Sequence, residues 1–222
     1  MRNIPVFTTE TGVASLTLEE IPYKQEAYII IHDSRDPRHF LEECAGFCYA
    51  AGAQRVFVSG VDSIDEYPLY TRIMRMGCSR DILPGSRDVL VPVTEQTVKV
   101  WTNIYNERMK SVPCTSTITH NRMQELVRSA SGYFIYRGSV LLGIGKVKGS
   151  VIEAVAGCVP GVGRDLIFAL NTALTGKELY VEVSDRNYKA IKLYKELGFT
   201  EESELNRWYV YQKITEVSNK NT

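Results

Sequence analysis

Residues 179–199 read LYVEVSDRNYKAIKLYKELGF, and they are the most informative part of the chain. Apolar residues alternate at positions 179, 181 and 183, which predicts a buried strand because successive strand side chains point to opposite faces. Asn187 suits the N-cap of a helix, and Gly198 suits its end. A strand, a short turn and a capped helix in this order predict one unit of an α/β protein.

A glycine-rich loop lies about twenty residues upstream and reads Cys158-Val-Pro-Gly161-Val-Gly163-Arg164. It leads into a predicted helix over residues 164–174. Glycines let a backbone approach phosphate groups closely, and the N–H groups at a helix N-terminus attract anions. Leu166 occupies the third small-residue position of a dinucleotide-binding fingerprint, which disfavours that fold. The loop therefore predicts a phosphate-bearing ligand, with a plain turn before a helix as the alternative.

Together these two stretches resemble the second half of the GNAT acetyltransferase fold. The family signature has Arg or Gln, two residues, Gly, one residue, then Gly or Ala; here the glycines are Gly161 and Gly163, and Cys158 replaces the Arg or Gln. Residues 193–199 match the Leu-Tyr-x-x-x-Gly-Phe pattern in full. The resemblance implies an α/β (α+β) fold with a mixed central sheet flanked by helices. It also implies acetyl transfer from acetyl-CoA, with no metal.

The resemblance gives roles to individual residues. It implies that Tyr194 protonates the departing CoA thiolate and that Glu182 is the general base for the amine. The five-residue spacing of Glu182 and Asn187 is similar to that of GNAT enzymes that acetylate the N-terminal alanine of ribosomal proteins. Structural alternatives are a packed tyrosine and a strand end that faces a polar cleft. The implied acetyl-CoA-binding residues are Val155, Ala156, Gly157, Gly161, Val162, Gly163, Arg164, Asn187 and Tyr194.

Residues 88–215 are predicted to be the catalytic domain, with the element order β-α-α-β-β-β-α-β-α-β. The Pro- and Gly-containing stretch at 81–88 is typical of a linker. Before the two stretches described above, strands are predicted at 89–93, 132–137, 140–147 and 151–156. Helices are predicted at 95–109 and 122–130.

Residues 1–83 are predicted to be a truncated, degenerate GNAT-like region, with a generic α/β segment as the alternative. We expect strands at 13–18, 27–31 and 55–59, and helices at 40–51 and 67–76, the latter closed by Gly77. No glycine pair precedes the first of these helices, and Ile73 stands four residues before Gly77 where the family pattern has tyrosine. This half is therefore predicted not to bind CoA productively.

Composition limits the remaining function classes. The 26 basic and 26 acidic residues balance, so no strong attraction to nucleic acid or membrane is predicted. Neither a spanning segment nor a secretory signal is apparent, and a cytoplasmic location is expected. Cys44 and Cys48, one helical turn apart, are interpreted as buried apolar residues. The expected partners are acetyl-CoA and a primary amine of a small molecule or peptide, and a homodimer is compatible with the sequence. The alternative function is a non-catalytic acetyl-CoA sensor or interaction module.

Overall fold

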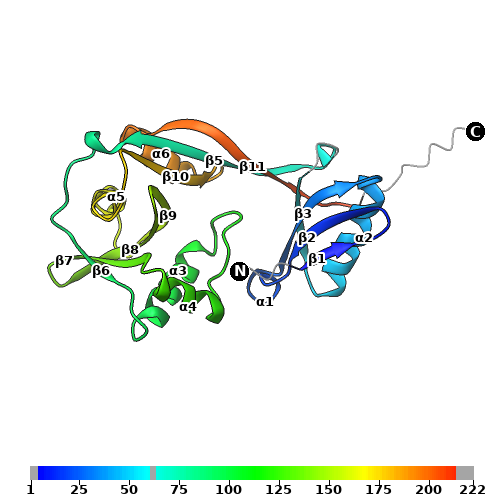
Figure 1. The fold of residues 1–222 in the computed structure, drawn as a ribbon, viewed down its shortest axis with the longest axis horizontal. Coiled ribbons are helices and arrows are strands. Elements are labelled where there is room, and N and C mark those ends of the chain that lie inside the picture. Colours follow the sequence, from blue (N-terminus) through cyan, green and yellow to red (C-terminus); the bar gives the residue numbers. More distant parts are fainter. Residues whose placement is uncertain (1–4, 61–63, 214–222) are drawn as a thin grey trace, which may run out of the picture. The chain divides into compact units, whose positions relative to one another are not determined.

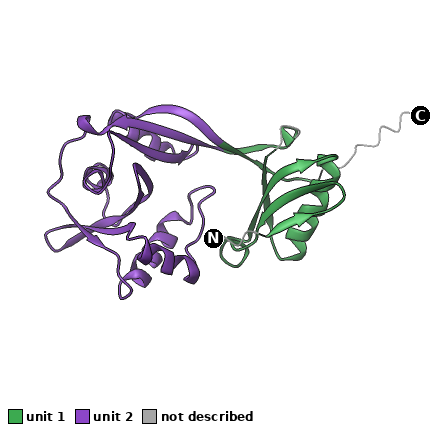
Figure 2. Ribbon diagram, viewed as in Figure 1, with its two compact units in different colours: residues 1–71, 206–222 green, residues 72–205 purple. Residues whose placement is uncertain are grey.

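The computed structural model describes residues 5–60 and 64–213. The chain forms two compact units, Met1–Thr71 with Asn206–Thr222 and Arg72–Leu205 (Figure 2). Both boundaries fall inside strands, because β5 (Leu69–Ser79) and β11 (Thr200–Val210) each begin in one unit and end in the other. The boundaries between the two compact units therefore lie outside the linker predicted at residues 81–88.

The first unit is a sheet in the order β1-β2-β3-β4-β11, with α2 packed on one face (Figure 1). β3 and β4 are parallel, and the other pairs are antiparallel. Cys44 and Cys48 on α2 are fully buried, as the sequence predicted, and burial raises the pKa of these thiols to about 12 and about 11. The elements are β1 (Val6–Thr8), β2 (Gly12–Thr17), α1 (Ile21–Lys24), β3 (Glu26–Ser34), α2 (Pro37–Ala50) and β4 (Arg55–Ser59).

The second unit contains both the glycine loop and residues 179–199. Its sheet runs in the order β11-β5-β10-β9-β8-β7-β6, with helices on both faces (Figure 1). The predicted order of strands and helices from residue 88 onward is confirmed. The elements are β6 (Val89–Pro92), α3 (Val98–Met109), α4 (His120–Arg128), β7 (Gly132–Arg137), β8 (Val140–Lys148), β9 (Val151–Gly157), α5 (Gly163–Asn171), β10 (Glu178–Ser184) and α6 (Tyr188–Glu196).

Two apolar cores lie on opposite faces of this sheet. α5 and α6 cover the first core, where Leu166, Leu170 and Val181 are almost completely buried. α3 and α4 cover the second core, which contains Trp101 and Phe134. Burying each of these large side chains contributes roughly 1.5–3 kcal/mol, so the two cores hold the helices firmly against the sheet.

The predicted helix at 67–76 is wrong, because this segment forms most of strand β5. β5 pairs antiparallel with β10 over seven residues. Met74, Met76 and Cys78 alternate along the strand and all contact the core under α5 and α6. Methionine favours helices in isolation, but this alternation fits a strand, and pairing with β10 supplies the backbone partners that a helix would otherwise provide.

Arg80 fixes the end of β5 to the C-terminus of α5. Its Nε donates to Asn171 Oδ1 at 2.6 Å, and its Nη2 donates to the Asn171 carbonyl oxygen at 2.6 Å. Its Nη1 donates to the Gly176 carbonyl oxygen at 2.8 Å. A cation at a helix C-terminus is favourable because it satisfies exposed carbonyl groups and opposes the negative end of the helix dipole. β5 is therefore an integral strand of the second unit.

Candidate active site

The site is built around two parallel strands that separate. β9 pairs with β10 only at Val151–Tyr180 and Ile152–Val181. On its other edge β9 carries a bulge, because consecutive pairs with β8 use Ile152 and Ala154 and leave out Glu153. A bulge bends its strand and increases the local twist. Beyond the bulge, residues 154–157 keep their partners on β8 and have none on β10.

The separation opens a gap at the carboxyl end of the two strands, which is where parallel α/β sheets bind ligands. Predicted ligand-binding residues Val155, Ala156 and Gly157 lie along the β9 edge of this gap. Because β10 remains fully paired with β5 on its far side, the gap is confined to the space between β9 and β10. Backbone groups along the β9 edge are thus left for a ligand.

The glycine loop brings the chain from this gap to the N-terminus of α5. The Cys158 N–H donates to the Leu142 carbonyl oxygen at 2.7 Å, which fixes the start of the loop. Gly161 has φ of +81°, a conformation that favours glycine, and a Cβ at this position would meet nothing within 4 Å. Open space beside Gly161 is what close approach of a phosphate requires.

The N-terminus of α5 is not capped by a side chain. Its N-cap residue is Val162, and the Leu166 N–H makes the first intrahelical bond, to the Val162 carbonyl oxygen at 3.0 Å. The N–H groups of the preceding turn, including those of Gly163 and Arg164, therefore begin the helix without an intrahelical acceptor. Such groups, together with the helix dipole, form an anion-binding site.

The charged side chains near the glycine loop, Arg164 and Asp165, each form an ion pair. Arg164 forms a 3.6 Å ion pair with Glu196 of α6, and both side chains are about half exposed. An exposed ion pair contributes only about 0–1 kcal/mol, so a phosphate could compete for Arg164 at little cost. Asp165, also in the first turn of α5, forms a 3.2 Å pair with Arg137, which offsets its negative charge.

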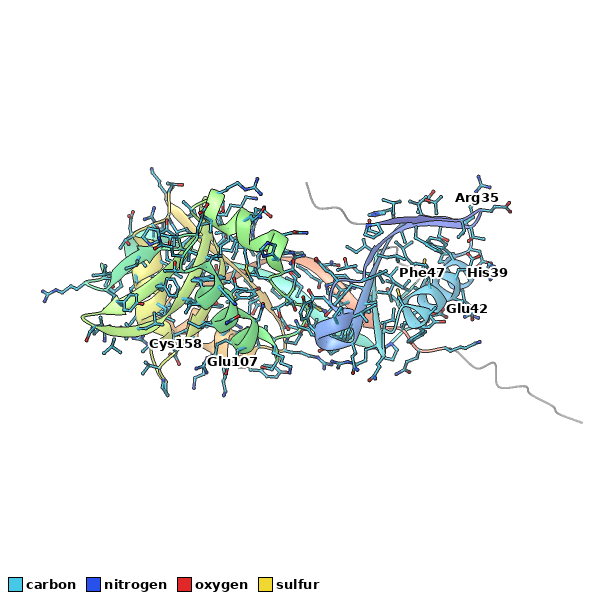
Figure 3. The ribbon with its side chains drawn as sticks, turned by 90° about the horizontal axis from the view of Figure 1, so that it is seen from below. Arg35, His39, Glu42, Phe47, Glu107 and Cys158 are labelled. Carbon is cyan, nitrogen blue, oxygen red and sulfur yellow. The ribbon has the colours of Figure 1, made fainter. Side chains whose placement is uncertain are left out.

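Cys158 stands where the family signature has Arg or Gln, and it cannot replace that charge. The residue is partly buried with Glu107 of α3 nearby (Figure 3), and the charge of Arg108 also acts on it. Burial is the largest influence and raises the thiol pKa; Arg108 lowers it, and Glu107 raises it. The thiol is therefore protonated at neutral pH and supplies no charge to the loop.

α6 packs directly on the glycine loop. A Cβ at Gly163 would lie 2.8 Å from Cδ2 of Leu193, so glycine allows the close approach of the two helices. Asn187 caps α6, because its Oδ1 accepts the Ala190 N–H at 3.3 Å. Gly198, with φ of +89°, follows the helix as predicted. The two sequence motifs that lie thirty residues apart are thus brought into contact.

Tyr194 lies on the face of α6 that packs into the core. Only 6% of the residue is exposed, and its ring centroid is 5.4 Å from that of Phe199. Burial raises the pKa of its hydroxyl to about 12. The phenol is therefore neutral throughout the physiological range and carries the proton that a general acid must donate.

Glu182 and Tyr194 occupy opposite faces of β10. Val181 and Val183 point into the same core as Tyr194, so Glu182 points to the other face. Its side chain is 47% exposed, and its Oε1 lies 3.9 Å from Nη2 of Arg75, its register partner on β5. The two predicted catalytic groups can reach one molecule only if that molecule occupies the gap between β9 and β10.

Arg75 is the residue beside the site that the sequence did not predict. It stands in the segment interpreted as a helix, and the residue opposite it, Glu182, lies far along the chain. Its guanidinium carbon lies 5.0 Å from the ring centroid of Tyr180. The alternation of Met74, Met76 and Cys78 was the available signal, since a strand would have placed Arg75 on the opposite, polar face.

A cavity of about 170 Å³ lies elsewhere in the second unit, under the N-terminal part of α6. It contains none of the predicted site residues. Four of its lining residues are charged and the rest are apolar. The lining residues are Arg72, Met74, Met76, Val183, Asp185, Ile191, Glu201 and Glu204.

Within residues 5–60 and 64–213, no three His, Cys, Asp or Glu side chains gather as metal ligands. None of the helices in the same ranges is long and apolar enough to cross a bilayer.

No protein-family model matches the sequence, and no curated protein matches it at a significant level. Solved structures do match. A conserved protein of unknown function from Staphylococcus epidermidis has a TM-score of 0.60 at 9% identity, over 95% of this chain and 94% of that one. A GCN5-related N-acetyltransferase from Kribbella flavida has a TM-score of 0.60 at 6% identity, over 92% and 58%. A GNAT-family acetyltransferase from Colwellia psychrerythraea has a TM-score of 0.52 at 10% identity, over 93% and 84%.

Identities this low show the fold alone. The order of strands and helices in the second unit and the separated β9 and β10 agree with that likeness. The chain therefore has the GNAT acyl-CoA N-acyltransferase fold, a mixed sheet with helices on both of its faces.

Proposed function

We propose that this chain is an N-acetyltransferase that moves an acetyl group from acetyl-CoA to a primary amine of a small molecule or peptide by direct attack. One observation carries the proposal: the uncapped, glycine-lined N-terminus of α5 contacts the helix that bears Tyr194, beside the gap between β9 and β10. A pyrophosphate site, an extended gap and a neutral phenol are the three features that a CoA thioester requires.

In this mechanism the acceptor approaches from the face of β10 that carries Glu182, and its ammonium group gives one proton to that carboxylate. The free amine then attacks the thioester carbonyl, whose oxygen accepts a hydrogen bond from a backbone N–H within residues 155–157 that faces the gap. The new C–N bond forms, the amine loses its second proton to water, and the C–S bond breaks. The departing thiolate takes a proton from Tyr194, which water then restores. Glu182 then gives its proton to water, so one proton is released overall.

Binding of acetyl-CoA is the first test. A ligand at 100 times its dissociation constant adds about 2.7 kcal/mol to the free energy of unfolding if it binds only the folded state. In a chain of this size that gain raises the melting temperature by several degrees. We expect a rise with acetyl-CoA and with desulfo-CoA, and none with NAD. Equal shifts with NAD, or no shift with acetyl-CoA, would contradict the proposal.

A second candidate is a sensor that binds acetyl-CoA without transferring the acetyl group. Two observations favour it: Cys158 replaces a charged or polar residue of the signature, and Glu182 faces a cation, Arg75. Thermal stabilisation by acetyl-CoA with no CoA release over a broad panel of amines would support the sensor. An interaction module without any CoA site would show neither response.

The resemblance to enzymes that acetylate ribosomal-protein N-termini rests on the spacing of Glu182 and Asn187. Asn187 already has a structural role, since its side chain caps α6. The spacing is thus compatible with that acceptor and equally with others, and we keep the broader proposal of a primary amine.

We further propose that residues 1–83 include a degenerate GNAT-like half that binds no CoA, and that residues 88–215 form the acetyltransferase domain, whose sheet β5 of the preceding range completes. The helix after β3 is capped by Asp36, whose Oδ1 accepts the His39 N–H at 3.2 Å. A carboxylate there occupies the place that an anion would take. In addition, β4 pairs with β3 along its whole length, which leaves no gap between them.

A further inference from the structure

The guanidinium of Arg75 is held in place while its hydrogen-bond donors are unused. Its Nε–H is enclosed and makes no hydrogen bond within residues 5–60 and 64–213. Its closest carboxylate oxygen, Oε1 of Glu182, lies 3.9 Å from Nη2, which is beyond hydrogen-bond distance. The guanidinium carbon lies 5.0 Å from the centroid of the Tyr180 ring and makes a cation–π contact with it. Native structures satisfy nearly all such enclosed donors with protein or water, so this donor is available to a ligand.

A carboxylate without a described partner lies on the same face. Gly77 follows Arg75 by two positions and therefore shares its face of β5. A Cβ at Gly77 would overlap Oε1 of Glu202 and lie 3.0 Å from Cδ1 of Tyr180, so the Glu202 carboxylate sits over Gly77 beside the tyrosine ring. Glu202 makes no hydrogen bond or ion pair with the described residues. Tyr180 is thus flanked by a cation and an anion.

We propose that Arg75 binds a carboxylate carried by the acceptor, so that the acceptor is an amino acid whose amino group lies toward Glu182. This inference rests on the proposed acetyltransferase function. The planar guanidinium matches a carboxylate in two parallel hydrogen bonds. An acceptor with only an ammonium group would meet repulsion from Arg75, whereas an amino acid places opposite charges on both Arg75 and Glu182.

The carboxylates around Arg75 decide between kinds of anion. A phosphate carries up to two negative charges and would lie close to both Glu182 and Glu202, which are exposed carboxylates on the same face. A carboxylate carries one negative charge, and the neighbouring ammonium of an amino acid compensates it. The arrangement therefore favours an amino acid over a phosphorylated amine.

The test compares binding of matched pairs of compounds by calorimetric titration in the presence of CoA. The probes are alanine, methionine, phenylalanine and lysine, each with the amine that remains when its α-carboxylate is removed. We expect at least one amino acid to bind tenfold more tightly than its matched amine, and Arg75→Gln to abolish that ratio. Arg75→Lys, which keeps the charge and loses the planar group, should retain part of it. Equal binding within every pair, no binding by any of the eight compounds, or an unchanged ratio in Arg75→Gln would overturn the assignment.

Arg72→Gln is the matched control. Arg72 also lies on β5, but it pairs with Glu204 at 3.5 Å, and its loss should leave the ratio unchanged. Melting temperatures of all variants establish that they fold. Acetyl transfer to the same compounds is measured separately. Carboxylate-dependent binding without transfer would refute the acetyltransferase and keep the role of Arg75. Transfer that shows no preference for a carboxylate would refute the role of Arg75 and keep the acetyltransferase.

Discussion

Replacing Tyr194 by phenylalanine separates catalysis from packing at this site. The ring of Tyr194 is buried against Phe199 and the apolar core under α5 and α6. Its hydroxyl makes no hydrogen bond within the part of the chain that the structure describes. Phenylalanine keeps every ring contact and removes only the hydroxyl. The substitution should therefore change the free energy of unfolding by less than about 1 kcal/mol, because no intramolecular hydrogen bond is lost.

The expected effect on turnover is far larger. Proton donation by a positioned side chain contributes about 10²- to 10⁴-fold to a rate, so Tyr194→Phe should lower kcat by a factor in that range. Tyr194 acts on the thiolate only as the C–S bond breaks, so kcat and kcat/KM for acetyl-CoA should fall by the same factor. Burial raises the pKa of Tyr194 to about 12, so the wild-type acid stays protonated and the difference should persist from pH 7 to pH 9.

The assay is the steady-state release of CoA thiol with saturating amine. Tyr188→Phe is the matched control, because Tyr188 begins the same helix and is 75% exposed. It should retain wild-type turnover. Wild-type turnover in Tyr194→Phe would remove this residue from the mechanism. A loss of acetyl-CoA binding in Tyr194→Phe would show instead that the hydroxyl contributes to binding. That result would refute the expectation that the hydroxyl acts only as the C–S bond breaks.

A fragment of residues 72–205 should unfold cooperatively in urea, whereas a fragment of residues 88–215 should not. The second fragment lacks β5, which leaves the β10 edge and the core under α5 uncovered. Equal stability of the two fragments would contradict this prediction. Gly163→Ala should cost no more than about 1 kcal/mol in urea unfolding, because the added methyl would lie 2.8 Å from Cδ2 of Leu193, the end of a flexible side chain that can turn aside, and a loss of about 3 kcal/mol would mean that Leu193 is held rigidly between the two helices. In reductant, the contribution of Cys78 to stability should be constant below pH 9 and fall as pH rises from 9 through 11, because burial, with a smaller contribution from the charge of a nearby glutamate, raises the Cys78 pKa from 9.0 to about 11 and the unfolded thiol loses its proton first. Cys78→Ala should show a smaller fall between pH 9 and 11 than the wild type, and an identical fall would exclude this thiol as a cause.

Local patterns predicted the second unit well. The glycine loop, the cap at Asn187 and the core face of α6 each depend on residues within one or two helical turns, so the sequence contains all the information that they need. The same is true of β7, β8 and β9, whose turns are marked by Gly138 and Gly149 with positive φ. Elements of this kind form where local preference and the final fold agree.

β5 was not predictable in the same way. Its identity as a strand depends on pairing with β10, which lies about a hundred residues later in the sequence. The methionines and the glycine in this segment fit a helix and its end when neighbours are unknown. The position of Arg75 opposite Glu182 follows only from that pairing, so the same missing contact hid the charged residue beside the site. Long-range pairing outweighed local propensity here.

The bulge in β9 was equally hidden, and it explains why one unit has a gap and the other has none. β3 and β9 each precede a helix and a parallel strand, and each carries a bulge, at His32 and at Glu153 respectively. β4 pairs with β3 at five positions and ends before the bulge. β10 pairs with β9 at only two positions and continues past it.

The chain after β4 also closes the space that stays open in the second unit. Gly60 follows β4 with φ of +130°, and a Cβ there would overlap the backbone oxygen of Ile31, next to the bulge. The backbone of Gly60 thus fills the position where the first unit would otherwise admit a ligand. In the second unit the corresponding edge, residues 154–157, has no such cover from β10. The same connection of strand, helix and parallel strand therefore forms a closed sheet in one unit and an open gap in the other, and the position of the bulge relative to the end of the pairing decides between them.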